Sequence, residues 1–136
     1  MLLERENWTG LKKTGEACWA QARANYAASV TLLDAGVYFA SVFFAQQAAE
    51  QALRAAVIEK NGRVSRGHNL IQMSNTLEAP LEIMNAAAEL NPTFLGTRCP
   101  EIVNGVPAQN HDRRSARFCL KCAQLIVDWI KSDLYQ

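Results

Sequence analysis

Two long segments with the apolar spacing of an α helix, separated by a single glycine, constrain the fold of this chain most. Apolar side chains recur every three or four residues in residues 11–35 and again in residues 37–60, and Gly36 separates the two. The stripes contain Trp19, Ala22, Tyr26, Val30 and Leu33 in the first segment, and Val42, Ala45, Ala49, Leu53, Ala56 and Val57 in the second. Because each segment spans about seven helical turns and the link is short, we expect an antiparallel helical hairpin.

Three further segments complete a predicted bundle of about five helices. Residues 69–77 and 81–90 form two short helical patterns, and Pro92 ends the second of them. Asp112 is predicted to cap a last helix, residues 112–134, which carries apolar residues at bundle spacing. No segment shows sustained two-residue alternation, so the predicted fold class is all-α, an antiparallel up-and-down bundle without a sheet.

The stretch before this last helix, residues 93–109, is predicted to be a long loop. It contains Gly96, Pro100, Gly105 and Pro107, which is too many helix-breaking residues for a regular helix. Long loops in compact domains are often functional, so this connection is a candidate ligand-facing region.

Composition places the chain among globular proteins. Its 136 residues, 49% hydrophobic and 20% charged, suit one domain over residues 1–136. No apolar run reaches the ~18 residues of a membrane span, and charged residues follow the N-terminal Met too soon for a signal peptide, so we expect a cytoplasmic protein. A net charge of +1 means that any binding of nucleic acid must depend on a local surface.

A basic stripe begins the last helix. Arg113, Arg117 and Lys121 are four residues apart and share one helix face, with Arg114 beside them. Such a stripe can contact phosphates through charge, and the alternative is a solvated face that balances nearby acids.

Arg98, in the long loop, is the second candidate. Its guanidinium could hold a phosphate, or it could anchor the loop through a pair with Glu50 or Glu101. Glu50 lies near the apolar arc of its helix, where a buried charge requires a counter-charge.

Other polar and aromatic residues are given structural interpretations. Cys119 and Cys122, with the distant His111, do not supply the four ligands of structural zinc, so we predict no metal and interpret both thiols as core residues. His68 is interpreted as a cap or hydrogen-bond partner of the short helix that follows it. A phenylalanine cluster is interpreted as core, with a dimer surface as the alternative; its members are Phe39, Phe43 and Phe44.

Several of these segments, in this order, resemble HEPN domains, a family named for its occurrence in higher eukaryotes and prokaryotes. The run from Cys18 to Tyr26 resembles the first HEPN helix, and the glutamine-rich run from Phe44 to Ala55 resembles the second. Gly67-His68-Asn69-Leu70 is similar to the start of the third helix, and Arg98-Cys99-Pro100-Glu101 resembles an Arg-Tyr-Pro-Asp loop of one subgroup. The resemblance covers roughly residues 16 to 134.

The resemblance implies a helical bundle, commonly a homodimer, in a family associated with RNA cleavage, nucleotide binding and toxin-antitoxin pairing with small nucleotidyltransferases. Catalytic members carry an Arg and, after roughly four to six intervening residues, a His near the last helix, where the two can stabilise phosphate and transfer protons. Here His111 precedes Arg113 and Arg114 instead. Arg63 and His68 have four residues between them, but they lie between the second and third predicted helices.

Three functional hypotheses follow. The first is a noncatalytic module that binds nucleotide or RNA phosphate; the second is a metal-independent endoribonuclease toxin with a rearranged Arg and His set. The third is a dimeric interaction protein that partners a nucleotidyltransferase. The candidate nucleotide-contacting residues are Arg98, Glu101, His111, Arg113, Arg114 and Arg117. No catalytic residue, cofactor or metal is assigned.

Overall fold

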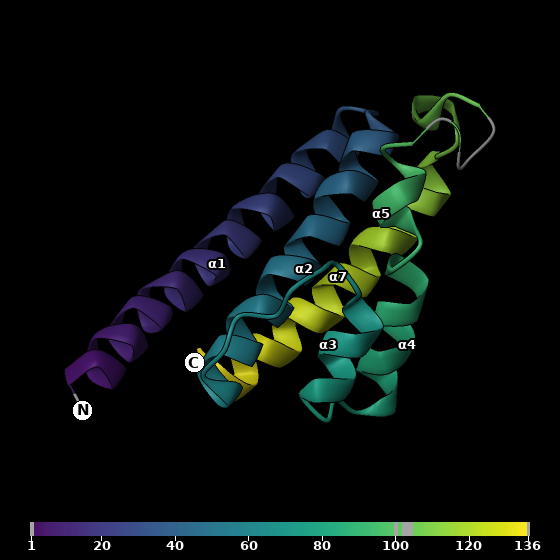
Figure 1. The fold of residues 1–136 in the computed structure, drawn as a ribbon. Helices are drawn as coiled ribbons and strands as arrows, with labels where there is room; N and C mark the ends of the chain where they lie inside the picture. Colours follow the sequence, from purple (N-terminus) through teal and green to yellow (C-terminus); the bar gives the residue numbers. More distant parts are fainter. Residues whose placement is uncertain (1, 100, 102–104, 136) are drawn as a thin grey trace.

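The structure is a computed structural model that describes residues 2–99, 101 and 105–135. Its helices are α1 (Leu2–Asp34), α2 (Tyr38–Asn61), α3 (Leu70–Thr76), α4 (Leu81–Leu90), α5 (Thr93–Gly96), the 3-10 turn η1 (Pro107–Gln109) and α7 (Arg113–Leu134). No strand occurs within these described residues, and the predicted all-α bundle is confirmed (Figure 1).

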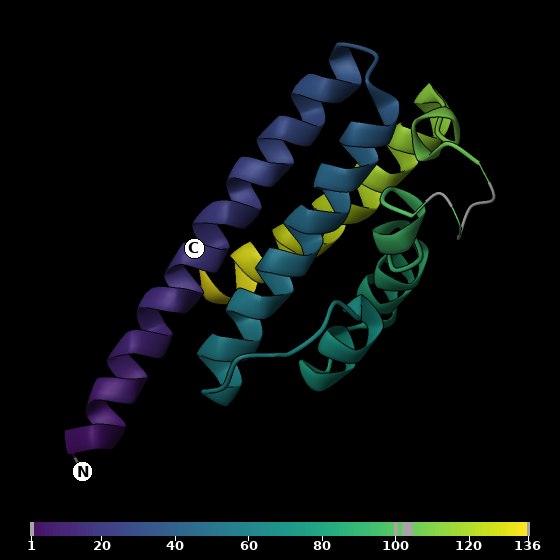
Figure 2. The same ribbon diagram turned by 45° about the horizontal axis from the view of Figure 1, so that its top comes forward.

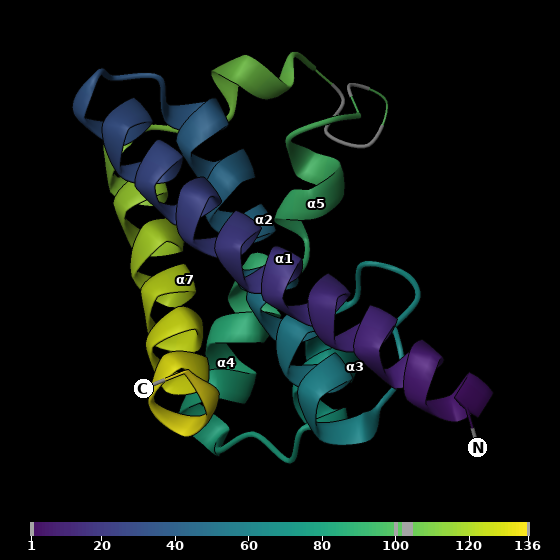
Figure 3. The ribbon, with the colours of Figure 1, turned by 90° about the vertical axis from the view of Figure 1, so that its left-hand side faces the viewer.

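The α1–α2 hairpin is the frame of the molecule, and α2 is its central helix. One side of α2 packs along α1, and α7, α3, α5 and η1 contact the rest of it (Figure 1). Because α1 has 33 residues and α2 has 24, the first turns of α1 extend beyond the end of α2 (Figure 2). α4 packs against α7 and α3 on the side of the bundle away from α1 (Figure 3).

Small side chains on α2 allow this close packing. Helix axes approach to about 8–10 Å depending on the side chains between them, so a helix rich in alanine can accept neighbours on several sides. The fully or almost fully buried alanines of α2 are Ala45, Ala48, Ala49, Ala52, Ala55 and Ala56. Larger residues from the surrounding helices complete the core, among them Leu70, Leu90, Ile126 and Ile130.

Several local predictions agree with the structure. Gly62 follows α2 in the left-handed conformation, with φ of 65°, and its N–H donates to the Ile58 carbonyl at 2.9 Å. Asp112 caps α7 by accepting from the Ser115 N–H at 2.8 Å. Cys119 and Cys122 are buried as predicted, and burial raises the pKa of the Cys119 thiol to about 11, with Cys122 and Glu89 adding to the effect.

Two predicted boundaries were wrong. The first helix was expected from residue 11 and begins at Leu2, because the residues before it include helix-favouring Leu, Glu and Arg and continue the same helix. Residues 93–109 were expected to be loop throughout, but Thr93–Gly96 forms a single helical turn and Pro107–Gln109 a 3-10 turn. Short turns of this kind need few residues, so Gly and Pro nearby do not prevent them.

No helix in the described part of the chain is both long enough and apolar enough to span a membrane.

A reciprocal pair of hydrogen bonds joins α1 to α2 inside the core. Ser29 Oγ donates to the Ser41 carbonyl at 2.7 Å, and Ser41 Oγ donates to the Ser29 carbonyl at 2.8 Å. Both serines are fully buried, so neither hydroxyl could exchange its partner for water.

We therefore expect Ser41→Ala to lower the free energy of unfolding by about 1–3 kcal/mol, because it leaves the buried Ser29 carbonyl without the Ser41 hydroxyl that donates to it. Urea unfolding followed by circular dichroism measures this. The control is Thr14→Ala, which removes an exposed hydroxyl bonded to Gly10 of the same helix and should change stability by less than about 0.5 kcal/mol. Equal effects of the two variants would contradict the assignment.

Candidate ligand-binding site

A buried carboxylate on α2 organises the polar centre of the molecule. Glu50 is 1% exposed, and its Oε2 lies 3.3 Å from Arg54 Nη1 while its Oε1 lies 3.0 Å from His68 Nδ1. Gln46, one turn earlier, donates from Nε2 to the same Oε1 at 3.1 Å. Removing a carboxylate from water is costly unless it is paired and hydrogen-bonded, and these three partners satisfy that requirement.

Arg54 fixes the link between α2 and α3 over this carboxylate. Its Nη2 donates to the Gly67 carbonyl and lies 3.4 Å from His68 Nδ1. Gly67 has φ of 86°, a left-handed conformation that favours glycine at this point. The link is thereby turned so that His68 faces Glu50.

Four planar groups form a column beside Glu50, and we call them the planar column: Phe43, Arg98, Phe94 and His68. His68 and Phe94 stack with ring centres 4.1 Å apart and planes 17° apart. The Arg98 guanidinium carbon lies 4.1 Å from the Phe94 ring centre and 4.3 Å from that of Phe43. Since Arg98 and His68 are both about 4 Å from the centre of one ring, they occupy its opposite faces.

Arg98 therefore holds α5 against α2. Its Nη1 also donates to the Phe94 carbonyl at 2.8 Å, and cations over aromatic faces are attracted by the ring quadrupole. Burial lowers the pKa of Arg98, and the nearby Glu50 carboxylate opposes this shift.

Two expected contacts are replaced by others. Among the described residues, Glu50 forms an ion pair with Arg54 and contacts His68 Nδ1, and the expected direct pair with Arg98 is not formed. The cap of α3 is the Asn69 side chain, which accepts from the Gln72 N–H at 3.0 Å, so His68 is free to bind Glu50 instead.

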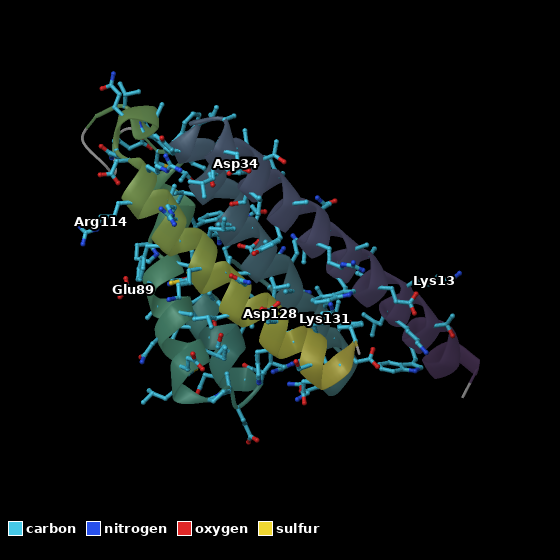
Figure 4. The ribbon with its side chains drawn as sticks, turned by 180° about the vertical axis from the view of Figure 1, so that it is seen from behind. Lys13, Asp34, Glu89, Arg114, Asp128 and Lys131 are labelled. Atoms are coloured by element: carbon cyan, nitrogen blue, oxygen red, sulfur yellow. The ribbon has the colours of Figure 1, made fainter. Side chains whose placement is uncertain are left out.

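The basic stripe of α7 lies at the end of the bundle where η1 leads into this helix. Arg113, Arg114, Arg117 and Lys121 are all exposed, and no ion pair to any of them exists within residues 2–99, 101 and 105–135. Figure 4 shows Arg114 projecting from the first turn of α7, far from Lys13 on α1. This end of the helix therefore presents four cationic side chains that form no ion pair in the described chain.

Two other candidates are His111, which directly precedes α7, and Glu101. His111 is half-buried, with Nδ1 3.1 Å from Ser115 Oγ, and burial lowers its pKa while Asp112 opposes the shift. Glu101 is exposed, and residues 100 and 102–104 on either side of it lie outside the described residues. The predicted Arg98-Cys99-Pro100-Glu101 loop can thus be followed only in part.

Sequence reasoning missed three members of the site. His68 and Phe94 were not connected with Glu50, because only the folded link and α5 bring them together. Arg54 did carry a signal, since it stands four residues after Glu50 and so shares a face of α2 with it. In the part of the chain that the structure describes, no group of three His, Cys, Asp or Glu side chains could hold a metal ion.

The described chain is thus an all-α bundle in which the α1–α2 hairpin packs on α7. The α2–α3 link covers the buried Glu50 carboxylate, which is the polar centre of the bundle. Comparison with known families identifies the bundle more closely: the HEPN domain model matches residues 16–133, and the chain belongs to the HEPN family.

Solved structures agree with this assignment. A protein from Thermus thermophilus is 29% identical with a TM-score of 0.82, and the match covers 88% of this chain and 98% of that one. An archaeal HEPN homologue is 26% identical with a TM-score of 0.76, covering 88% and 96% of the two chains. An HEPN domain protein from Thermotoga maritima is 25% identical with a TM-score of 0.69, covering 88% and 98%. No curated protein matches the sequence.

The Glu50 pairs lead to a stability prediction. Arg54→Met should lower the free energy of unfolding by about 2–4 kcal/mol, because it leaves the buried Glu50 carboxylate with fewer partners. We place the effect toward the lower end because the Arg54 side chain is still 19% exposed and partly screened by solvent. Lys12→Met removes an exposed cation from α1 and serves as the matched control in urea unfolding. A loss below about 0.5 kcal/mol for Arg54→Met would contradict the pairing.

Proposed function

We propose that this HEPN domain is a noncatalytic module that binds the phosphates of RNA or a nucleotide on the basic stripe of α7. One observation carries the proposal: Arg113, Arg114, Arg117 and Lys121 are exposed and have no ion-pair partner in the described chain. Since the net charge of the protein is only +1, attraction of a polyanion requires such a local concentration of charge.

The remaining candidates take supporting roles in this proposal. Arg98 positions α5 and the planar column, His111 precedes the stripe as a polar group, and Glu101 is an exposed polar group in the preceding connection. Because the Asp112 carboxylate already occupies the Ser115 N–H in the first turn of α7, the proposal rests on the side-chain charges of the stripe.

The alternative is endoribonuclease activity, and one observation favours it. His68 is oriented by a buried carboxylate, with Arg54 beside it, and a carboxylate-bound imidazole can transfer protons. Incubating the protein with mixed RNA in EDTA separates the two proposals. Cleavage that disappears in His68→Asn would place the enzyme ahead of the binding module; intact RNA would favour binding.

Assembly is a further part of the proposal and rests on the family. We propose a homodimer, with a small nucleotidyltransferase as partner in a toxin-antitoxin pair. Light scattering of the pure protein measures whether it is a dimer. Light scattering of a mixture with the product of any adjacent nucleotidyltransferase gene measures whether the two proteins form a complex.

Replacing Arg113, Arg114 and Arg117 by Ala should weaken binding of single-stranded RNA and flatten its salt dependence. Each phosphate contact contributes about 0.7 to the slope of log K against log salt for a single strand, so the slope should fall by about 2. Fluorescence anisotropy at several salt concentrations measures this.

The matched control is the triple variant of Lys12, Lys13 and Arg23 to Ala, which removes the same charge from the exposed surface of α1. It should leave the slope within about 0.5 of the original value. If the α7 variant bound RNA with the same affinity and salt slope as the unchanged protein, the proposal would be wrong.

A further inference from the structure

The planar column ends at His68, and this last ring is only partly covered. One of its faces stacks on Phe94, and its Nδ1 contacts Glu50. The His68 side chain is nevertheless 48% exposed. The exposed part of the ring is therefore its second face and its outer edge. Another planar group can stack on this face.

A hollow of about 300 Å³ lies beside the His68 and Phe94 rings. It is lined by His68, Asn69, Asn91, Pro92 and Phe94. Asn69 Oδ1 accepts from the Gln72 N–H at 3.0 Å, and Asn91 Oδ1 accepts from the Leu70 N–H at 2.9 Å. Both amide oxygens are thus occupied, and each side chain retains an NH2 group that can donate to acceptor atoms of a ligand.

Positive charge lies at the other end of the same link. A second hollow of about 330 Å³ includes Arg63, Ser65, Arg66 and Gln72 in its lining. Both arginines are exposed and have no ion pair in the described residues. Arg66 precedes His68 by two residues, so their Cα atoms are at most about 7 Å apart.

We propose that the link between α2 and α3 binds one nucleotide of a single-stranded RNA, with the base stacked on the open face of His68. The NH2 groups of Asn69 and Asn91 face acceptor atoms of the base, and Arg66 and Arg63 contact the neighbouring phosphates. The ligand is single-stranded because the bases of a duplex already stack on one another and cannot offer a free face.

This inference rests on the proposed function for its class of ligand, but it concerns a different surface. The α7 stripe attracts the backbone by charge alone. The His68 surface adds a contact that requires a base, because an aromatic face attracts any base and a phosphate does not stack.

Two substitutions of His68 test the stack. Both His68→Phe and His68→Leu lose the contact with Glu50, but only Phe retains a planar ring against Phe94. The probe is a fluorescent single-stranded oligoadenylate of about 12 nucleotides. We expect His68→Leu to weaken binding roughly 5- to 150-fold and His68→Phe to stay within about threefold of the unchanged protein, with similar salt slopes.

Arg66→Ala tests the adjoining phosphate contact. It should reduce the salt slope by about 0.7, whereas Lys13→Ala, on the exposed surface of α1, should not. Thermal unfolding of every variant checks that differences in binding do not reflect loss of the fold.

Adenosine, which has a base and no phosphate, separates this inference from the α7 proposal. Added to the isotopically labelled protein, it should shift the NMR signals of the His68 ring and of the Asn69 and Asn91 side-chain NH2 groups. No shift, together with equal RNA affinities for His68→Leu and His68→Phe, overturns the base site. In that case, RNA binding that still depends on Arg113, Arg114 and Arg117 leaves the α7 proposal in place. If neither the α7 variant nor the His68 variants changed RNA binding, both proposals would be wrong.

Discussion

The burial of one carboxylate determines much of the arrangement around α2. Glu50 is almost completely removed from solvent, so the fold must provide it with partners, and these come from its own helix and from the link that follows. His68 is thereby fixed, and through it Phe94 and α5 are placed against α2. A single desolvated charge thus connects the core of the bundle to its most irregular segment.

The helical scaffold was largely predictable because it depends on local periodicity. The stripes of α1, α2 and α7, the left-handed Gly62 and the Asp112 cap all follow from residue type and spacing. The extent of α1 was underestimated, since its first turns extend beyond α2 and residues 8–10 and 12–14 are exposed, so this part of the helix shows no apolar stripe.

The candidate site was less predictable because its members are distant in sequence. Glu50 and Arg98 were both recognised as residues that need partners, but the pairing between them was assigned by charge alone. In the structure His68 contacts the Glu50 carboxylate, and the Arg98 guanidinium packs on the rings of Phe43 and Phe94 instead. Charge can predict that a partner exists; only the path of the link and α5 decides which group reaches it.

The alanines of α2 have a consequence for how this domain can diversify. Because neighbouring helices lie directly on these small side chains, enlarging any of them would force the helices apart, and the central helix tolerates little change. The outward side of α7 carries no such restriction, and neither do the exposed Arg63 and Arg66 of the α2–α3 link, whereas Gly67 and His68 in that link are held by the backbone conformation and by Glu50. Relatives can therefore acquire new specificities by exchanging surface residues there, while the interior that supports them stays constant.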